Sequence, residues 1–315
     1  MKTVLNYFGM SMLVLLTLMG CQQKSGDNPE ETVSRGEMLV AVDESLQPVL
    51  TAEQEAFADK NKYAKVHMAY VPELLAIQLM LQDSARIAVV TRHLKADEKK
   101  IFEEKKLKYR AIHMATDALA FITNSKTSDT LISVDEIDGI MKGKITQWNQ
   151  LKHGKSSQKI SFVFDSDNSS NLQYLLDTLR IADKKQTPIY AVKSNKEVIE
   201  YIQKTPGAIG VIGVNWISDI DDPEHPRFMN GIKVMGVAKK ATTDLEQYFQ
   251  PFQYAIALKK YPLNRNVYMI TKEAKRGLGT GFINYVMTDA GQRIVLKSGL
   301  LPANQIIRLV QVRQM

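Results

Sequence analysis

The run Met38-Leu39-Val40-Ala41-Val42 predicts a β-strand, and the segment PVLTAEQEAFADK after it, residues 48–60, predicts a helix. Residues 66–70 (VHMAY) predict a second strand, and residues 72–83 predict a second helix that begins with a proline. Ile87-Ala88-Val89-Val90 is apolar at every position, as in a strand buried on both faces. Because strands that alternate with helices form parallel sheets, this stretch predicts an α/β fold with a mostly parallel sheet.

The rest of the chain repeats this alternation around two longer extended passages. Residues 111–123 (AIHMATDALAFIT) and 252–258 (FQYAIAL) predict those passages. The pattern further predicts helices at 134–141, 172–180 and 194–204, strands at 160–164 and 208–212, and a mainly helical tail at 276–297. We therefore expect two lobes, two mixed sheets flanked by helices and joined by two crossover strands, with the ends of the chain completing the first lobe.

The N-terminus predicts export from the cytoplasm. Lys2 precedes an apolar run at residues 7–16, which is shorter than the ~20 residues of a membrane-spanning helix. Cys21 is the only cysteine of the chain and follows Gly20, so the sequence LMGC resembles a bacterial lipobox, whose thiol is lipidated. We expect residues 1–20 to be a signal peptide; the alternative is an incidental cysteine in its apolar region.

The polar segment after Cys21 predicts a flexible tether. Residues 22–32 (QQKSGDNPEET) have no apolar periodicity, so we expect residues 21–33 to hold a folded body off the membrane. Gln22 favours the outer membrane, because Asp at this position favours inner-membrane retention in some bacteria. The expectation is a membrane-anchored lipoprotein of a bacterial envelope, facing the periplasm.

The composition indicates a globular protein without a nucleic-acid partner. The 315 residues are 44% hydrophobic and carry a formal charge of +7. The densest charged stretch, residues 95–110, mixes both signs around apolar positions, which is typical of a solvated helix. The basic, aromatic surface of a nucleic-acid binder is missing.

Signals of catalysis and of metal binding are weak. The histidines are scattered without metal-ligand spacing, at positions 67, 93, 113, 153 and 225. The serine-hydrolase and phosphate-loop motifs are absent, and residues 277–281 (GLGTG) predict a flexible turn beside a helix. We expect a protein that is not an enzyme and holds no cofactor or metal, with Trp148 and Trp216 as core or lobe-interface residues.

Four motifs carry a resemblance to a known family. They are residues 137–148 (IDGIMKGKITQW), 205–210 (TPGAIG), 261–265 (YPLNR) and 289–292 (DAGQ). In this order and spacing they resemble the phosphate-binding (PstS-like) proteins of bacterial ABC importers, of the type II periplasmic binding protein superfamily. The resemblance implies a monomer whose lobe I (34–113 and 256–315) and lobe II (114–255) close on phosphate or a related oxyanion and deliver it to an ABC permease.

The resemblance also implies the binding residues, which lie in four loops. The second loop, residues 70–73, lacks the family's serine and glycine residues. The other loops supply Ser45 and the Leu46 amide, Thr91 and Arg92, and then Asp165, Ser166, Ser169, Ser170 and Asn171. Hydroxyls and helix N-termini suit a buried anion, although the same serines are also typical of a helix-capping turn.

Two charges are exchanged relative to the family. Arg92 stands where the family usually has an acidic residue, and Asp165 stands where it usually has an arginine. We expect the two to face each other across the site. One alternative is a diverged sensor or scaffold lipoprotein in which they pair and leave no anion site. Another is a phosphate-handling hydrolase, for which no nucleophile and base are found.

Overall fold

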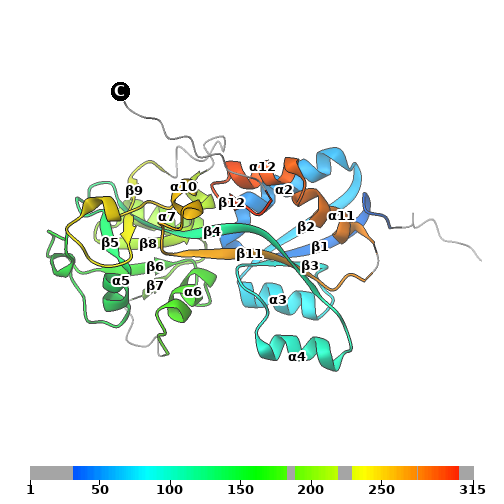
Figure 1. Ribbon diagram of the computed structural model, residues 1–315, viewed down its shortest axis with the longest axis horizontal. Helices are drawn as coiled ribbons and strands as arrows, with labels where there is room; N and C mark the ends of the chain where they lie inside the picture. The colour runs from blue at the N-terminus through cyan, green and yellow to red at the C-terminus, as the bar shows by residue number, and fades with distance from the viewer. Residues whose placement is uncertain (1–30, 183–188, 219–228, 275, 305–315) are drawn as a thin grey trace, which may run out of the picture. The chain divides into compact units, whose positions relative to one another are not determined.

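The computed structural model describes residues 31–182, 189–218, 229–274 and 276–304 (Figure 1). The predicted signal peptide, Cys21, Gln22 and His225 lie outside these residues. Within them, no helix has the length and apolar character needed to cross a bilayer.

The first lobe is built on the predicted alternation of strands and helices. Its parallel strands are β1 (Arg35–Asp43), β2 (Tyr63–Val71) and β3 (Ile87–Val90), with β1 in the middle. Helices α2 (Gln47–Lys60) and α3 (Glu73–Leu81) follow β1 and β2, and α4 (Ala96–Glu104) follows β3. Figure 1 shows α2 on one face of this sheet and α3 and α4 on the other. The alternation of buried side chains agrees, since Val40 and Val42 pack in the core cluster of α2 and Ala41 packs in that of α3.

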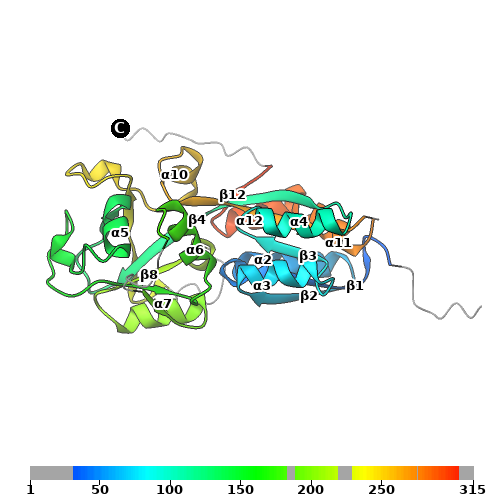
Figure 2. The ribbon, with the colours of Figure 1, turned by 90° about the horizontal axis from the view of Figure 1, so that it is seen from below.

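The second lobe repeats the architecture around β6 (Ser161–Phe164). This strand pairs in parallel with β7 (Ile189–Ala191) and β8 (Ala208–Gly213). Helices α5 (Val134–Met141), α6 (Ser170–Thr178) and α7 (Asn195–Lys204) lie close to the predicted bounds. Smaller elements are β5 (Leu131–Ser133), β9 (Ile232–Val234), β10 (Gly236–Ala238), α8 (Asn215–Ser218) and the 3₁₀ turns η2 (Trp148–Gln150) and η4 (Leu245–Gln247). In Figure 2 the helices of the two lobes form separate groups.

Two long antiparallel strands connect the lobes. They are β4 (Arg110–Asn124), which confirms the first predicted extended passage, and β11 (Asn264–Thr271). The resulting strand order is β2-β1-β3-β11-β4-β8-β6-β7, so the sheet is mixed where the two crossover strands enter.

The second predicted extended passage is wrong. Residues 252–258 contain α10 (Gln253–Ala257), in which Ala255 and Ile256 are buried and Tyr254 is exposed. The apolar alternation of this segment is misleading because its amides bond within the helix rather than to a strand. The returning crossover lies further on, in the segment that begins with the YPLNR motif.

The last described part of the chain, residues 276–304, packs on the first lobe. Helices α11 (Leu278–Val286) and α12 (Asp289–Lys297) pack beside α2, and β12 (Leu301–Pro302) pairs with β4. The prediction of a flexible turn at 277–281 is wrong, because most of this segment is the first turn of α11. Glycine is needed there, since a Cβ at Gly281 would lie 1.8 Å from the carbonyl oxygen of Val33.

The folded body begins before the predicted end of the tether. Glu31 accepts a 2.7 Å bond from Arg86 and a 3.0 Å bond from the amide of Leu278. Val33 packs against α11 through the contact at Gly281. The last residues of the expected tether are therefore part of lobe I.

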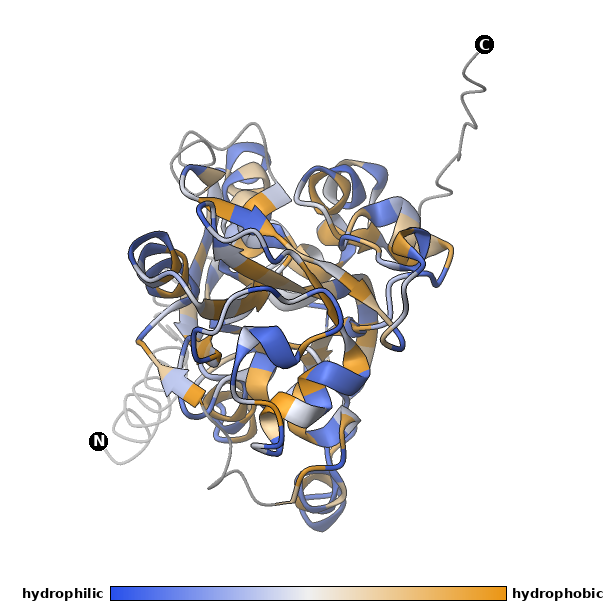
Figure 3. Cartoon of the chain, turned by 90° about the vertical axis from the view of Figure 1, so that its left-hand side faces the viewer, coloured by the Kyte–Doolittle hydropathy of each residue, from blue (hydrophilic) through white to orange (hydrophobic). Residues whose placement is uncertain are grey.

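Buried hydrophobic residues are frequent on the central strands, and the helices carry both hydrophobic and hydrophilic residues (Figure 3). Trp148 is fully buried, and its indole donates a 2.9 Å bond to the carbonyl of Gly207 in the motif TPGAIG. Trp216 is 6% exposed and contacts the first lobe through Ser45. Both tryptophans thus occupy the core and lobe-interface positions expected of them.

Candidate functional site

Two serines mark the carboxyl ends of strands from different lobes. Ser45 lies in the 3₁₀ turn η1 (Glu44–Leu46) directly after β1, and the Asp43 side chain accepts a 3.1 Å bond from its amide. Ser170 is the first residue of α6 in the second lobe, and Ser169 caps that helix by accepting the amides of Asn171 and Leu172. A strand end followed by a helix N-terminus is a place where fold geometry presents hydrogen-bond donors to a ligand.

The two lobes contact each other at these serines. The hydroxyl oxygens of Ser45 and Ser170 lie 3.4 Å apart. The carbonyl of Ser45 accepts bonds of 2.9 Å from the side-chain amide of Asn215 and 3.0 Å from the indole of Trp216. The turn after β1 is therefore held against the second lobe.

A second contact between the lobes joins Glu44 and Asn195. The backbone amide of Asn195, at the start of α7, donates 3.1 and 3.3 Å bonds to the Glu44 carboxylate, and the Asn195 side chain also donates to it. The Asn195 side-chain oxygen accepts a 3.2 Å bond from Asn171. These contacts link the first turn of lobe I to two helix N-termini of lobe II.

Arg265 is the cation at the centre of this arrangement. It lies in the crossover strand β11 and, among the residues that the structure describes, is the only buried arginine or lysine. Its guanidinium donates to the Asp117 carboxylate at 3.0 and 3.1 Å, to the Ser45 hydroxyl at 3.0 Å and to the Ser170 hydroxyl at 3.2 Å. One planar fork thus meets hydroxyls from both lobes and is oriented by a carboxylate of the other crossover strand.

The electrostatics around Arg265 keep it charged. Burial alone would lower the pKa of Arg265, but the carboxylates of Asp117, Asp43 and Glu73 hold that pKa above its ordinary value. Burial raises the pKa of Asp43 to about 7, with the Glu73 charge as the next cause. Burial likewise raises the pKa of Glu44 to about 7, with a further contribution from the Asp165 charge. The site therefore holds a fixed cation among carboxyl groups that change protonation near neutral pH.

Arg92 and Asp165 do not bond to each other, and each has its own partners. The Arg92 guanidinium donates to Glu73 at 2.9 Å and to both oxygens of Glu98 at 2.8 Å. Asp165 instead accepts bonds from Ser169 at 2.5 Å and from Asn171 at 3.3 Å. The reason is that each charged group has closer partners within its own lobe. The alternative in which these two residues neutralise each other is contradicted by the same contacts.

The Glu73 side chain organises the third loop. It accepts a 2.7 Å bond from the Thr91 amide and a 2.8 Å bond from the Thr91 hydroxyl, in addition to its ion pair with Arg92. The second loop, although it lacks the family's small residues, thus supplies a carboxylate to the third loop.

Burial raises the pKa of Asp165, against the opposing effect of its hydrogen bond from Ser169.

Several predicted residues share one cleft. Arg92, Ser169 and Ser170 line a cleft of about 320 Å³, together with Glu73 and Lys95. Ser166 has a buried hydroxyl without a hydrogen-bond partner, and Leu46 packs in the hydrophobic core beside Ser45. The structure thus brings Arg92 of lobe I and the α6 serines of lobe II to a common opening.

The prediction of site residues missed Arg265, Asp117, Asn215 and Trp216. The signal for Arg265 was present, since the residue ends the YPLNR motif and is followed by an alternating strand. The sequence also predicts that the protein holds no metal and no cofactor. In the described ranges, no group of three or more histidine, cysteine or acidic residues is arranged to hold a metal ion.

Comparison with known proteins identifies relatives of this arrangement. A phosphate-binding protein PstS of Borreliella burgdorferi is 29% identical over 196 residues, which cover 59% of this chain and 63% of that protein, less than two thirds of its length. The phosphate-binding protein PstS of Bacillus subtilis is 24% identical over 281 residues, covering 88% of this chain and 84% of that protein.

Solved structures agree in fold. A putative phosphate ABC transporter substrate-binding protein with bound phosphate, from Clostridium perfringens, superposes with a TM-score of 0.70 at 21% identity, covering 85% of this chain and 100% of that chain. An ABC-type phosphate transport receptor from Vibrio cholerae gives a TM-score of 0.63 at 19% identity, with 85% and 100% covered. The two-lobed α/β fold is thereby established. A family model described as a PBP superfamily domain matches residues 27–290, most of the chain, and the protein therefore belongs to the PBP superfamily.

Proposed function

We propose that the protein is an extracytoplasmic solute-binding protein that captures phosphate or a related oxyanion between its lobes for an ABC importer. The observation that carries the proposal is the buried Arg265 fork, which meets the Ser45 and Ser170 hydroxyls from opposite lobes. The relatives named phosphate-binding protein PstS support phosphate as the substrate. Binding without chemical conversion follows from this role, so the protein is not an enzyme.

The donor set suits an oxyanion. Hydroxyls and a guanidinium fork supply hydrogen-bond donors without water, and a ligand oxygen that displaces the Ser45 to Ser170 contact gains donors from both lobes. Burial raises the pKa values of Asp43 and Asp165, so we infer that their neutral forms lie beside the bound oxyanion without repelling it. Leu46, Thr91, Arg92, Ser166, Ser169 and Asn171 stay predicted ligands of the same site.

Capture and release require the lobes to move. The two crossover strands, β4 and β11, form the connection about which the lobes hinge in this proposal. Asp117 and Arg265 lie on these strands, so the ion pair that orients the ligand is also close to the hinge. In this proposal the described residues divide into lobe I, at 31–113 and 256–304, and lobe II, at 114–255, so that lobe I begins three residues before the predicted boundary.

The proposal includes an anchor. Residues 1–20 act as a signal peptide, Cys21 carries the lipid and the following residues form the tether that holds a monomer at the envelope membrane, with the outer membrane favoured by Gln22. The partners are then the ligand oxyanion, the permease of an ABC importer and the membrane.

Calorimetric titration of the full chain with phosphate, sulfate and arsenate tests the site. We expect phosphate to bind, and Ser170→Ala to weaken it about tenfold, or roughly 1.4 kcal/mol, because one donor from lobe II is lost. Ser157→Ala is the matched control, since Ser157 is an exposed serine of the same lobe, and it should bind like the parent. If none of the three oxyanions binds, the proposal is wrong.

The crowding of carboxyl groups favours one alternative function, that of a sensor or scaffold lipoprotein. Arg92 is saturated by Glu73 and Glu98, and several carboxyl groups crowd the single buried arginine. A sensor or scaffold lipoprotein of the same fold would tolerate such crowding because it transports no anion. The titration separates the two functions, since the alternative requires that no oxyanion binds.

A further inference from the structure

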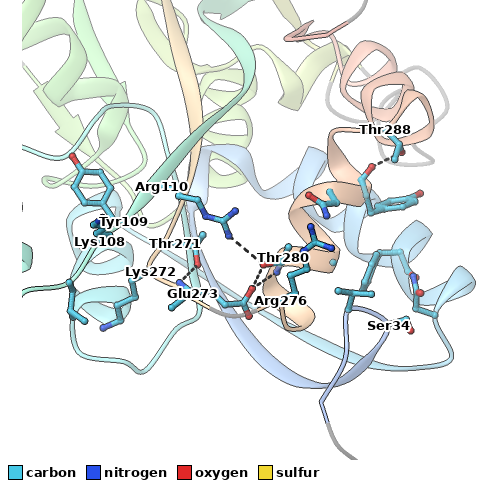
Figure 4. Close-up of a pocket in the computed structure, with 18 of the residues that line it drawn as sticks. Ser34, Lys108, Tyr109, Arg110, Thr271, Lys272, Glu273, Arg276, Thr280 and Thr288 are labelled. Carbon is cyan, nitrogen blue, oxygen red and sulfur yellow. Dashed lines mark hydrogen bonds between the residues drawn. The ribbon is translucent and has the colours of Figure 1, made fainter.

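A second cavity lies in lobe I and shares no residue with the cleft described above. Its volume is about 1360 Å³, and it lies between the ends of α2, α4 and β11 and the first turns of α11. Six basic side chains line it, against one acidic side chain; the basic residues are Lys60, Lys106, Lys108, Arg110, Lys272 and Arg276. Figure 4 shows Arg110 and Arg276 on opposite sides of Thr280.

Most of this positive charge is uncompensated. The acidic residue, Glu273, is already engaged by Arg86 and by the amide and hydroxyl of Thr280. Lys272 is paired with Asp83 at 2.6 Å. Among the described residues, no carboxylate forms an ion pair with any of the other five cations, although Lys60 lies over the ring of Tyr285 at 5.1 Å. Unpaired cations around one concave surface attract an anionic partner.

Exposed apolar side chains lie among the cations. Leu107 and Val33 line the same cavity, and each is 43% exposed. Leu107 stands between Lys106 and Lys108 in the turn that ends α4, where Lys106 adopts a left-handed conformation with φ of 52°. Basic residues interleaved with exposed apolar ones are typical of surfaces that insert into the interface of an anionic bilayer.

The place of the cavity along the chain favours the same partner. Val33, the last residue of the predicted tether, lines it together with Ser34. Nine residues lie between Cys21 and Glu31, and even a fully extended chain over these ten steps spans only roughly 35 Å. A body held this close to a membrane can bring lobe I to the lipid surface.

We propose that this cavity binds the phosphate headgroups of anionic phospholipids and seats lobe I on the membrane. Lys106, Lys108 and Arg110 contact the headgroups, and Leu107 and Val33 enter the apolar boundary beneath them. This cavity is separate from the proposed oxyanion site, so failure of phosphate binding there would not affect it, but the closeness of the tethered body to a membrane rests on the lipid anchor of the proposed function. The cavity is also larger than a single inorganic anion requires, which favours a surface of several headgroups.

The test uses a fluorophore placed beside the cavity. Because Cys21 is the only cysteine, the full chain with Cys21→Ser and Glu103→Cys carries a single thiol, on the exposed last turn of α4. An environment-sensitive label there is titrated with phosphatidylcholine vesicles, with vesicles that also contain phosphatidylglycerol, and with inorganic phosphate. Residues 7–16 are apolar enough to bring any variant to a vesicle, so the emission of the label is measured rather than vesicle binding.

We expect a blue shift with the phosphatidylglycerol vesicles only. In the same labelled chain, the triple change Lys106→Gln, Lys108→Gln and Arg110→Gln should raise the required phosphatidylglycerol content or weaken the response at least tenfold. The control Lys239→Gln, Lys240→Gln and Lys259→Gln removes the same charge from exposed lysines around α10 and β10, and should respond like the parent. Leu107→Ser should reduce the shift.

Three results would overturn the proposal. An equal response to pure phosphatidylcholine would mean that charge plays no part, and a response to inorganic phosphate alone would make the cavity a site for free anions. Equal weakening by both triple variants would mean that net charge, rather than this cavity, attracts the vesicles. Unchanged thermal unfolding of each variant keeps loss of folding from imitating any of these outcomes.

Discussion

The inter-lobe site and the basic cavity of lobe I differ in the burial and the pairing of their positive charges. Among the described residues the inter-lobe site has one buried arginine, whose guanidinium donates to Asp117, Ser45 and Ser170. The cavity has several exposed cations with few partners of their own. Burial makes each interaction strong and specific, whereas exposure leaves a longer-range attraction that salt screens. The first arrangement suits one small ligand and the second suits an extended anionic surface.

The strongest test of this comparison is the loss of the buried cation. Arg265→Ala leaves the Asp117 carboxylate buried without its partner, and we expect the free energy of unfolding to fall by about 3–5 kcal/mol. Urea denaturation measures this change. Arg293→Ala is the control, because Arg293 and Asp289 form an exposed pair that should contribute under about 1 kcal/mol.

Binding gives the same test a second readout. Arg265→Lys keeps a charge but loses the planar fork, so it should fold better than the alanine variant and still bind phosphate at least tenfold more weakly. Parent-like phosphate affinity in Arg265→Lys would remove Arg265 from the proposed site while leaving its structural role intact.

The local parts of this site could be predicted from the sequence. Ser45 follows an apolar strand, and Ser169 precedes a helix, so their places at a strand end and a helix N-terminus depend on neighbouring residues only. Helix α5 has its predicted bounds, and its start depends on neighbouring residues in the same way, since Ser133 and Glu136 form a capping box within four residues.

The partners of the charged groups could not be predicted in this way. Arg265 meets Ser45 across 220 positions of sequence, and Arg92 turns to Glu73 and Glu98 rather than to Asp165 because these carboxylates lie nearer after folding. Family position suggested an exchange of charges between Arg92 and Asp165, but which charges pair is decided by tertiary packing. The misassigned segment at α10 has an alternating pattern that fits a strand, but its amides bond to carbonyls within the same segment.

Glu53 differs from the carboxyl groups of the inter-lobe site. It is buried as they are, but neither an ion pair nor a hydrogen bond stabilises its charge. It is fully buried in α2, both of its oxygens lack hydrogen bonds, and burial raises its pKa to about 9. The protonated form is favoured in the folded state, so stability is full below the ordinary pKa near 4.5 and is lost as pH rises toward 9.

We expect Glu53→Gln to remove this dependence on pH. Between pH 5 and 7 the parent should lose roughly 3 kcal/mol of unfolding free energy relative to the variant, from about 1.4 kcal/mol per pH unit. Urea denaturation at several pH values measures the difference. Glu55→Gln, on the exposed face of the same helix, should leave the pH profile of the parent unchanged. Parallel profiles for the parent and Glu53→Gln would mean that the carboxyl group finds a partner or solvent in the folded protein.

The smallest expected effect concerns the carboxyl groups around the buried arginine. Burial and the Glu73 charge give Asp43 a pKa of about 7, so Asp43 is mainly neutral at pH 6 and mainly ionised at pH 8. An ionised Asp43 repels a bound oxyanion and competes with it for Arg265, which should weaken phosphate binding up to about tenfold, or 1.4 kcal/mol. Phosphate itself titrates in this range, so the quantity to follow is the ratio of the parent's affinity to that of Asp43→Asn, measured by calorimetry at both pH values. That ratio should fall between pH 6 and pH 8, while the ratio to the exposed control Asp97→Asn should stay constant. A constant ratio for Asp43→Asn as well would place the ligand away from Asp43. The proposed site would then consist of Arg265 and the serines without this carboxyl group.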